Sequence, residues 1–345
     1  MRKARVATQL ASLALFAVSV AFALHWRAGR LLFQGDPLNA GAASLALRAA
    51  VAAIFIVVAS LVLTLFYGRV FCGWACPLDS VVDKLDFVLR RRPRAANWRA
   101  LKYHLLIVIA CLAAGGLAVA WLLDPLNWAA RIIALPLGAH AEIFAGATLL
   151  AILVSLEASL GRRGFCRVLC PLGALLGAVT VVTGYRFKVA KTCTQCGTCV
   201  ERCRMVALAN TPPKQRRAEC IHCRECDTAC PVHAISFRYA RRPAYHAPDL
   251  ARRQFLFSLA GGLAAAFGLR SRGDWLNSPT ATLRPPGAVP DAQFRNQCIR
   301  CGSCLRACPT GGLRADLGHS GLPWFETPRL SGRDGGCSFE CNACG

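Results

Sequence analysis

Cysteines at regular spacing are the residues of this chain best suited to chemistry. Two runs share the spacing C-x2-C-x2-C-x3-C: Cys193, Cys196, Cys199 and Cys203, then Cys220, Cys223, Cys226 and Cys230. Three thiolates spaced by two residues can wrap one face of an iron–sulfur cubane, whereas the fourth cysteine lies too far around to join them. We therefore expect each fourth cysteine to bind the other cluster. One [4Fe–4S] centre then takes Cys193, Cys196, Cys199 and Cys230, and the second takes Cys220, Cys223, Cys226 and Cys203.

Structural zinc is the alternative for these two runs. Zinc sites normally use separated C-x2-C pairs, whereas each of these runs is an unbroken triplet with a trailing fourth cysteine. The spacing is typical of bacterial ferredoxins with two clusters. It predicts electron transfer, carried by a small α+β ferredoxin-like domain over residues 186–240.

A second region with the same chemistry lies at the end of the chain. Its cysteines are Cys298, Cys301, Cys304 and Cys308, followed by Cys337, Cys341 and Cys344. The later group lacks one cysteine of a complete run, and the sequence stops at Gly345. We interpret the chain as a fragment, with a cluster that lacks a local thiolate as the alternative. The sequence thus predicts two clusters, and up to four if this region is complete.

Two shorter segments repeat the pattern F-C-x3-C-P. Their cysteines are Cys72, Cys76, Cys166 and Cys170. Cysteines four residues apart on a helix share one face, which suits joint ligation. The duplication indicates an internal repeat, and the four thiols form a candidate redox or metal site. The alternative is that these small residues pack a helix end.

Composition favours a membrane protein. The chain has 345 residues, which suggests about two domains, and its hydrophobic fraction is 55% with a formal net charge of +23. The mean hydropathy of +0.40 is high for a soluble protein. Basic residues cluster at the ends of apolar segments and not along an aromatic-rich stripe. This distribution argues against a nucleic-acid partner and indicates membrane topology.

Four apolar segments approach the roughly 20 residues that cross a bilayer: Val6–Leu24, Ser44–Phe66, Leu101–Leu123 and Leu137–Leu160. Basic residues crowd the connection over residues 67–102 and the stretch after Leu160, whereas the connection between the third and fourth segments holds only Arg131. The positive-inside rule then places the N-terminus and the first ferredoxin-like region in the cytoplasm. We expect a multi-pass protein of the bacterial inner membrane, with a membrane module over residues 1–185.

A fifth apolar segment follows twin arginines. Arg252 and Arg253 precede an apolar stretch that ends at Leu269, a pattern typical of a Tat-type export signal. A fifth membrane helix is the alternative, and both predict a periplasmic C-terminal region. We assign residues 241–275 to a basic linker with this segment and residues 276–345 to the second ferredoxin-like region. The expected fold is an α-helical membrane module of four to five spans with two small ferredoxin-like α+β iron–sulfur regions.

These motifs together resemble two protein families. The four apolar segments, the duplicated F-C-x3-C-P and the first ferredoxin run, over about residues 1–240, resemble the NapH/MauN ferredoxin-type membrane proteins. The twin arginines and later cysteines, over about residues 250–345, resemble the NapG/MauM periplasmic ferredoxins, so the chain looks like a fusion of the two. The resemblance implies a quinol dehydrogenase pair that draws on the quinone pool and supplies a periplasmic cytochrome or reductase subunit, notably for nitrate. One departure is Arg204, which follows Cys203 in place of proline.

Quinol oxidation releases two protons with two electrons and so needs a proton acceptor. The candidates are His104, Asp124, His140 and Glu142. Each lies near the end of an apolar segment, where hydration makes a purely structural explanation equally good. A b-type haem is not favoured because no two histidines form an obvious pair at one membrane depth. No nucleotide-binding motif is present.

Two other functions share parts of this pattern. Related membrane ferredoxins serve in the maturation or regulation of copper or nitrous-oxide respiratory enzymes, with additional domains that this sequence does not show. A methylamine-utilisation ferredoxin would share all the features described. The residues do not name the final acceptor, the quinone type or the direction of electron flow, and they leave open whether the chain is itself an enzyme.

Overall fold

The computed structural model describes residues 2–23, 51–89, 97–115, 117, 119–134, 143–183, 185–209, 213–239, 251–271, 283–291, 294, 298, 300, 302–316, 320, 324–332, 335–337 and 341. The chain divides into two compact units. The first comprises Met1–Leu15, Val58–Leu106 and Ala151–Arg252, and the second comprises Phe16–Val57, Ile107–Leu150 and Arg253–Gly345.

A helix pattern occurs twice around the F-C-x3-C-P segments. In each copy a long helix is followed by a helical turn with the first cysteine and by a helix that starts at a proline: α4 (Val51–Tyr67), α5 (Val70–Trp74) and α6 (Pro77–Leu89), then α9 (Ile143–Leu160), the π-helical turn η6 (Phe165–Leu169) and α10 (Pro171–Val179). Proline suits a first helical position because no backbone N–H donor is needed there. Each second cysteine therefore directly precedes a helix start.

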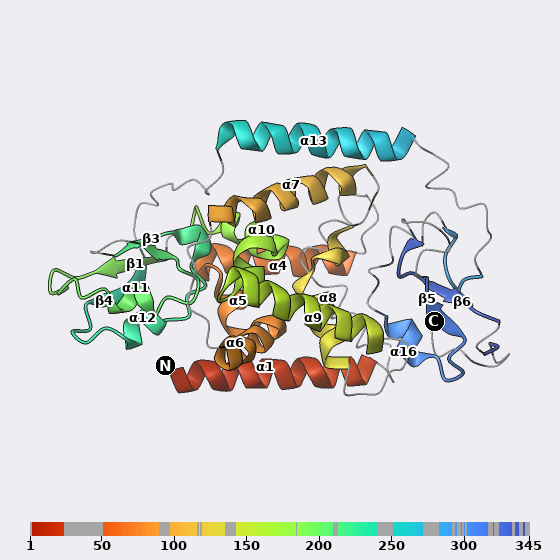
Figure 1. Ribbon diagram of the computed structural model, residues 1–345, viewed down its shortest axis with the longest axis horizontal. Coiled ribbons are helices and arrows are strands. Elements are labelled where there is room, and N and C mark those ends of the chain that lie inside the picture. The colour runs from red at the N-terminus through yellow and green to blue at the C-terminus, as the bar shows by residue number, and fades with distance from the viewer. Residues whose placement is uncertain are drawn as a thin grey trace. The chain divides into compact units, whose positions relative to one another are not determined.

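The first cysteine region folds as short helices and paired strands (Figure 1). Its elements are β1 (Tyr185–Val189), α11 (Thr198–Glu201), β2 (Leu208–Ala209), β3 (Lys214–Gln215), η7 (Arg217–Glu219), α12 (Glu225–Thr228) and β4 (Ile235–Tyr239). β1 and β4 pair antiparallel, from Tyr185 opposite Tyr239 to Val189 opposite Ile235. This pair joins the two ends of the region, and α11 and α12 carry the third cysteine of each run.

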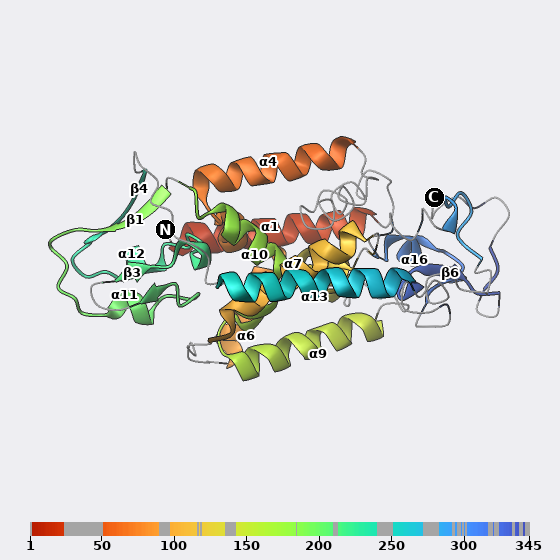
Figure 2. The same cartoon turned by 90° about the horizontal axis from the view of Figure 1, so that it is seen from above.

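The second unit contains the C-terminal cysteine region. Besides parts of four longer helices, it contains η3 (Ala120–Leu122), α8 (Pro125–Ala134), most of α13 (Arg252–Ser271), α16 (Ser303–Ala307), β5 (Leu313–Ala315) and β6 (Pro328–Leu330). β5 and β6 are antiparallel, with Leu313 opposite Leu330. Figures 1 and 2 show α13 beside α7 (Leu101–Ala114). A Cβ at Gly262 of α13 would lie 3.0 Å from Cys111 Sγ. Cys111, which belongs to none of the cysteine runs, is therefore a packing residue.

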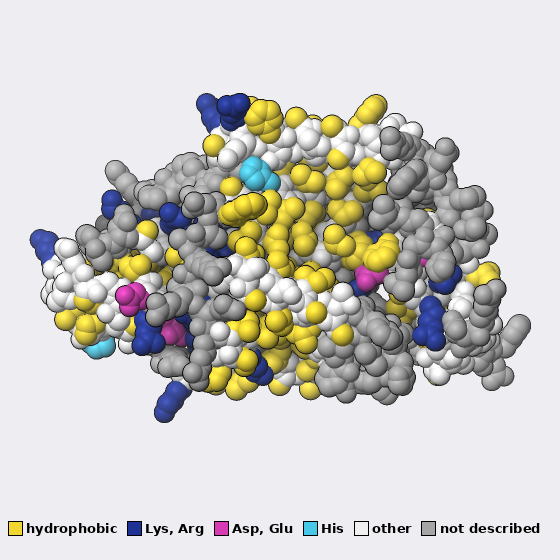
Figure 3. All heavy atoms as spheres, in the orientation of Figure 1, with side chains coloured by type: hydrophobic (Ala, Val, Ile, Leu, Met, Phe, Trp, Pro, Cys, Tyr) yellow, Lys and Arg dark blue, Asp and Glu magenta, His cyan; other side chains and the backbone are white. Residues whose placement is uncertain are grey.

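Helix α13 begins at the twin arginines and exposes apolar side chains along its length. The exposed ones include Phe255, Phe257, Leu263 and Phe267. Figure 3 shows basic side chains at one end of this helix and apolar ones beyond them. The interpretation of Arg252 and Arg253 as an export signal stays a prediction.

The expectation of a membrane module with four to five spans is wrong. Among the residues that the structure describes, none of the helices combines the length and the apolarity that a bilayer crossing requires. The reason is clearest in α4 and α7, whose 17 and 14 residues fall short of the roughly 20 needed. Residues 44–50 and 137–142 of two expected spans lie outside the described ranges.

Several basic residues that we attributed to membrane topology are buried in the first unit. Lys102 is fully buried, and its Nζ donates to a Glu219 carboxylate oxygen at 2.6 Å. Arg5, in α1 (Arg2–Ala23), donates to Asp83 at 2.9 Å and to Glu225 at 3.2 Å. Buried charges need such partners because desolvation of an unpaired ion costs several kcal/mol. These residues therefore hold the unit together.

Candidate iron–sulfur sites

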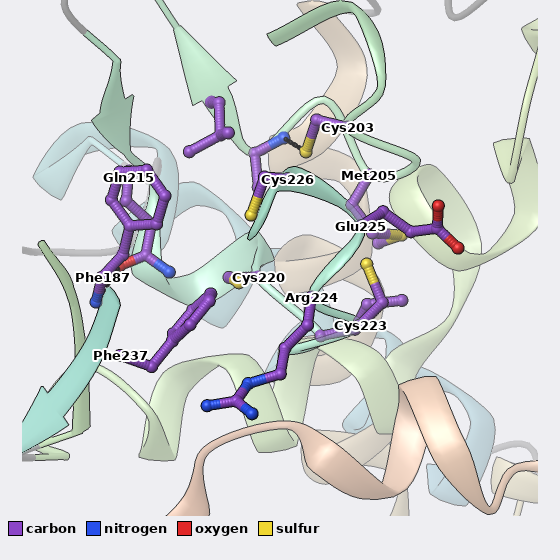
Figure 4. A pocket seen from close by; sticks show the side chains of 13 residues that line it. Phe187, Cys203, Met205, Gln215, Cys220, Cys223, Arg224, Glu225, Cys226 and Phe237 are labelled. Carbon is purple, nitrogen blue, oxygen red and sulfur yellow. Dashed lines mark hydrogen bonds between the residues drawn. The ribbon is translucent and has the colours of Figure 1, made fainter. Parts of the chain in front are cut away.

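Four thiols of the first cysteine region line one cavity: Cys203, Cys220, Cys223 and Cys226. Figure 4 shows them around one space, with the aromatic rings of Phe187 and Phe237 on one side. Leu208, Ile221 and Met205 add apolar side chains to the lining, which also includes Gln215, Arg224 and Glu225. These are the four cysteines that the spacing assigns to one cluster. Four thiols in a mainly apolar cavity fit the cysteine ligation of a [4Fe–4S] group.

The backbone turns left-handed at equivalent points of both runs. The second residue after the first cysteine has a positive φ, 56° at Gln195 and 51° at His222. The fourth residue does too, with 78° at Gly197 and 60° at Arg224. A left-handed residue among right-handed ones points successive N–H groups into one concavity, the arrangement found around many iron–sulfur clusters.

The fourth cysteine of each run is held by an equivalent hydrogen bond. The N–H of Ala207 donates to Cys203 Sγ at 3.2 Å, and the N–H of Ala234 donates to Cys230 Sγ at 3.3 Å. In both cases the donor lies four residues after the cysteine. The residue before the donor is left-handed, with a φ of 50° at Val206 and 48° at His233. Such bonds favour the thiolate, which is the form that binds iron.

Burial raises the pKa of Cys220, Cys223 and Cys226 in the cavity. The pKa of Cys220 rises to about 12, first because the thiol is desolvated and then because Cys223 and Cys203 are close. The pKa values of Cys223 and Cys226 are raised chiefly by the same desolvation. Four clustered thiolates are therefore unfavourable by themselves and need a cationic partner. The iron atoms of a cluster supply that charge, with release of the thiol protons.

The other predicted ligand set adjoins this cavity. Cys199 is buried, its pKa is raised mainly by burial, and Cys193 and Cys196 act on it electrostatically. Cys230 packs against the apolar cluster of Cys199, Leu208 and Ile235. Cys203 and Cys226 contact that same apolar cluster, so the two sets of thiols share one wall. Among the described residues, no three Cys, His, Asp or Glu side chains are placed to bind a single metal ion.

The C-terminal region repeats the same backbone turns. Arg300, two residues after Cys298, has a φ of 54°, and Gly302 and Gly311 have 71° and 65° at the other two equivalent positions. Burial would raise the pKa of Cys308, but hydrogen bonds from the Thr310 hydroxyl and nearby backbone N–H groups lower it overall. Cys301 and Cys344 lie outside the described residues.

The start of the last cysteine group lies against the loop that follows Cys308. A Cβ at Gly335 would meet the carbonyl oxygen of Thr310 at 2.4 Å, which shows how closely the two backbones approach. Cys337 follows two residues later and is exposed. Cys341 is half-buried.

An arginine that we had noted only as a loop charge supports this C-terminal loop. Arg131 of α8 donates to Glu326 Oε1 and to the Arg300 carbonyl oxygen, both at 2.6 Å. The Arg300 guanidinium lies 4.5 Å from the centre of the Trp121 ring. The segment from η3 to α8 is thereby packed onto the loop between the first two cysteines of the run.

The F-C-x3-C-P cysteines lie next to the first cysteine region. Cys72 and Cys166 pack against the apolar cluster of Met205, Ala207 and Ile221, which Cys203, Cys220 and Cys223 also contact. Cys76 and Cys170 are buried. Sequence reasoning did not identify Glu157, which is buried and accepts the N–H groups of Gly164 and Phe165 at the start of the second segment.

The structure describes two of the four proton-acceptor candidates, Asp124 and His104. Asp124 is buried, and its carboxylate accepts the N–H groups of Leu126 and Asn127 at 3.1 and 3.0 Å. It is the N-cap of α8, with Pro125 at the first helical position. His104 is half-buried on α7. His140 and Glu142 lie outside the described residues.

Comparison with known proteins relates these segments to iron–sulfur proteins. A family of 4Fe-4S binding domains matches residues 49–95 and 142–188, and another family of that description matches residues 294–314. The first match covers both F-C-x3-C-P segments, and the second covers the run that begins at Cys298. No solved structure matches.

Curated relatives match different parts of the chain. YccM of Escherichia coli, a candidate electron transport protein, is 29% identical over 60% of this chain and 61% of its own length. The ferredoxin-type protein NapH of Haemophilus influenzae is 29% identical over 61% of this chain and 78% of its own length. The ferredoxin-type protein NapG of Escherichia coli is 40% identical over 28% of this chain and 42% of its own length. Methylamine utilization ferredoxin-type proteins also match.

Proposed function

We propose that this chain, which is related to the NapH/NapG and MauN/MauM ferredoxin-type proteins, carries electrons from quinol toward a periplasmic reductase of the nitrate type. Relatives of both the NapH and the NapG kind match this one polypeptide. Each quinol gives up two electrons and two protons, so the chain would carry two electrons in one-electron steps. Quinol and the periplasmic acceptor rest on the family resemblance.

The observation that carries the proposal is the cavity with four thiols beside a second thiol set. Cys203, Cys220, Cys223 and Cys226 surround an apolar space, and ligands of both predicted sets share one apolar wall, formed by Cys199, Leu208 and Ile235. Such a wall brings two clusters close while excluding water. When bound, the clusters supply the one-electron chemistry, and this chain's residues orient them and set their potentials.

The test is reduction of the purified full chain by a quinol analogue, followed by EPR spectroscopy under anaerobic conditions. The proposal predicts iron–sulfur signals that grow on reduction and weaken in the double variant Cys220→Ser/Cys223→Ser. The matched control is Cys111→Ser, which removes a packing cysteine outside every run. A chain that contains its iron but is reduced only by dithionite would contradict quinol as the donor and leave electron transfer intact.

The location of the protein is part of the proposal. We infer association with the bacterial inner membrane, with the first cysteine region on the cytoplasmic side and the C-terminal region on the periplasmic side. Membrane fractionation and thiol labelling from each side would test it, and recovery of the intact protein in the soluble fraction would contradict it.

Methylamine utilisation is the second candidate, because MauN-type and MauM-type proteins match at 34% and 46% identity. A deletion strain separates the two. Loss of growth by nitrate respiration favours the first function, and loss of growth on methylamine favours the second.

A further inference from the structure

We propose that the two F-C-x3-C-P segments together build one further iron–sulfur centre, ligated by Cys72, Cys76, Cys166 and Cys170, that exchanges electrons with the neighbouring Cys203–Cys226 cavity. The inference deepens the proposed function and rests on it. It assigns one shared centre to the two segments, with two ligands from each.

The four thiols converge from two parts of the chain. Cys72 lies in α5 and Cys76 directly before α6, while Cys166 lies in η6 and Cys170 directly before α10. Cys170 acts electrostatically on Cys76 of the other segment and on Cys166 of its own, and Cys72 acts on Cys76. Cys76 and Cys170 are 7% and 6% exposed. Cys72 and Cys166, the first cysteines of the two segments, both pack against the apolar cluster of Met205, Ala207 and Ile221, so the two segments bring their cysteines to one region.

In both segments the second cysteine accepts an equivalent backbone hydrogen bond. The N–H of Gly173 donates to Cys170 Sγ at 3.2 Å, and the N–H of Asp79 donates to Cys76. Each donor lies three residues after its cysteine, in the first turn of the following helix. A helix start with its N–H groups aimed at a sulfur favours a thiolate. Burial raises the pKa of Cys76 overall, and the Asp79 N–H offsets only part of that rise. The matching bonds place the two second cysteines in equivalent settings.

A buried arginine from each segment reaches the other segment. Arg163 is bonded to the Asp79 carboxylate, with one Nη2–Oδ2 distance of 3.1 Å. Gly173 occupies in the second segment the position that Asp79 occupies in the first. Arg69 lies against Gly173, because a Cβ there would be 2.7 Å from Arg69 Nη2. Both arginines are at most 1% exposed. Because each crosses to the opposite segment, the geometry supports a joint centre and not two separate ones.

The arginines also provide positive charge where an anionic group would sit. Arg69 interacts electrostatically with Cys72 and Cys170, and Arg163 with Cys166. Four cysteine thiolates around a cluster carry net negative charge, and neighbouring cations stabilise it.

The proposed centre contacts the first cysteine region directly. A Cβ at Gly73 of α5 would meet the Ile221 carbonyl oxygen at 2.5 Å, so the backbone beside Cys72 touches the loop between Cys220 and Cys223. Arg69 donates to the Ala218 carbonyl oxygen at 2.6 Å. This contact gives a route for single electrons between the shared centre and the cavity.

The experiment compares three variants of the full chain: Cys72→Ser/Cys76→Ser, Cys166→Ser/Cys170→Ser, and all four replacements together. Iron and acid-labile sulfide per chain are measured after anaerobic purification, with Cys111→Ser as the control. A shared centre predicts that each double variant loses the same iron, about four atoms, and that the quadruple variant loses no more. The EPR signal that depends on Cys220 and Cys223 should persist in every variant, which shows that the fold is retained.

Three outcomes would overturn the inference. Additive losses would mean one centre per segment. Unchanged iron with two fewer thiols titrated after oxidation would mean a dithiol pair. Zinc in place of the lost iron would mean a single-ion site. In each of these cases the proposed function would still hold if the iron that is lost on replacing Cys220 and Cys223 is present. A wild-type chain without iron would contradict the proposed function itself.

Discussion

The cysteine loops of the first and the C-terminal regions share a backbone and differ in what they are attached to. His222 and Arg300 occupy the same position, two residues after the first cysteine, with φ values of 51° and 54°. In both, the carbonyl oxygen accepts a hydrogen bond from another element: Trp74 Nε1 donates to His222 at 3.1 Å, and Arg131 Nη2 donates to Arg300 at 2.6 Å. The equivalent Gln195 is exposed. The cysteine spacing thus sets the loop, and this one carbonyl attaches it to a helix.

The attachments differ in chemistry. Around the first region, Lys102, Arg69 and Glu219 form buried ion pairs next to Cys220. In the C-terminal region Arg131 forms one ion pair with Glu326, and Arg300 makes a cation–π contact with the Trp121 ring. The four predictions below test how strongly each loop depends on its attachment.

The largest effect is expected from Lys102→Met. This change leaves Glu219 buried without its 2.6 Å partner, which should lower the free energy of unfolding by about 3–5 kcal/mol. Denaturant unfolding of the purified chain measures it. The matched control is Lys84→Met, because Lys84 is exposed in α6. Equal effects of the two substitutions would contradict the structural role given to Lys102.

Arg131→Gln should weaken the C-terminal loop. The variant loses charged hydrogen bonds to Glu326 and to the Arg300 carbonyl, a loss of about 1.5–3 kcal/mol. Limited proteolysis should then cut the C-terminal region faster, while the iron bound by the first region is unchanged. Asp291→Asn breaks an ion pair whose acidic partner is 47% exposed and should have little effect. Faster cleavage in both variants would count against a specific attachment by Arg131.

A smaller effect is expected from Trp74→Phe. The substitution keeps the aromatic ring and removes the N–H that binds the His222 carbonyl, at a cost of about 1 kcal/mol. The midpoint of thermal unfolding should fall, and it should not fall in Trp98→Phe, because Trp98 is 67% exposed. An unchanged midpoint for Trp74→Phe would show that the carbonyl attachment contributes nothing measurable.

A pH dependence of stability is expected at Glu157. Burial raises its pKa from 4.5 to about 7, against the N–H bonds from Gly164 and Phe165, which lower it. Between these pH values the folded chain holds a proton that the unfolded chain has released, so stability should fall as pH rises from 4.5 to 7. Glu157→Gln should flatten this part of the curve of unfolding free energy against pH. A curve identical to that of the wild type would contradict the assignment.

The grouping of Cys203, Cys220, Cys223 and Cys226 around one cavity could be derived from sequence because cysteine spacing alone restricts which thiols can meet. The cap at Asp124 was also accessible, since an aspartate followed by proline before an apolar stretch is a helix-start signal. The left-handed turns were only partly visible. Gly197 and Gly302 suggest them, but Gln195, His222 and Arg224 are not residues that mark such a turn.

The roles of the basic residues could not be derived in this way. Arg69, Lys102 and Arg163 lie at the ends of apolar segments, which is also where topology signals occur. Their partners, Ala218, Glu219 and Asp79, are 84 to 149 positions away in the chain. A pattern read along the sequence cannot distinguish a charge that faces water from one that pairs with a residue so distant.

Iron and acid-labile sulfide per chain, compared between the wild type and Cys203→Ser/Cys220→Ser, test the central claim most directly. The account predicts at least about eight iron atoms with matching sulfide in the wild type, and a loss of about four in the variant. Both replaced residues line the cavity of Cys203, Cys220, Cys223 and Cys226. Zinc in place of iron, or iron content unaffected by the variant, would contradict it.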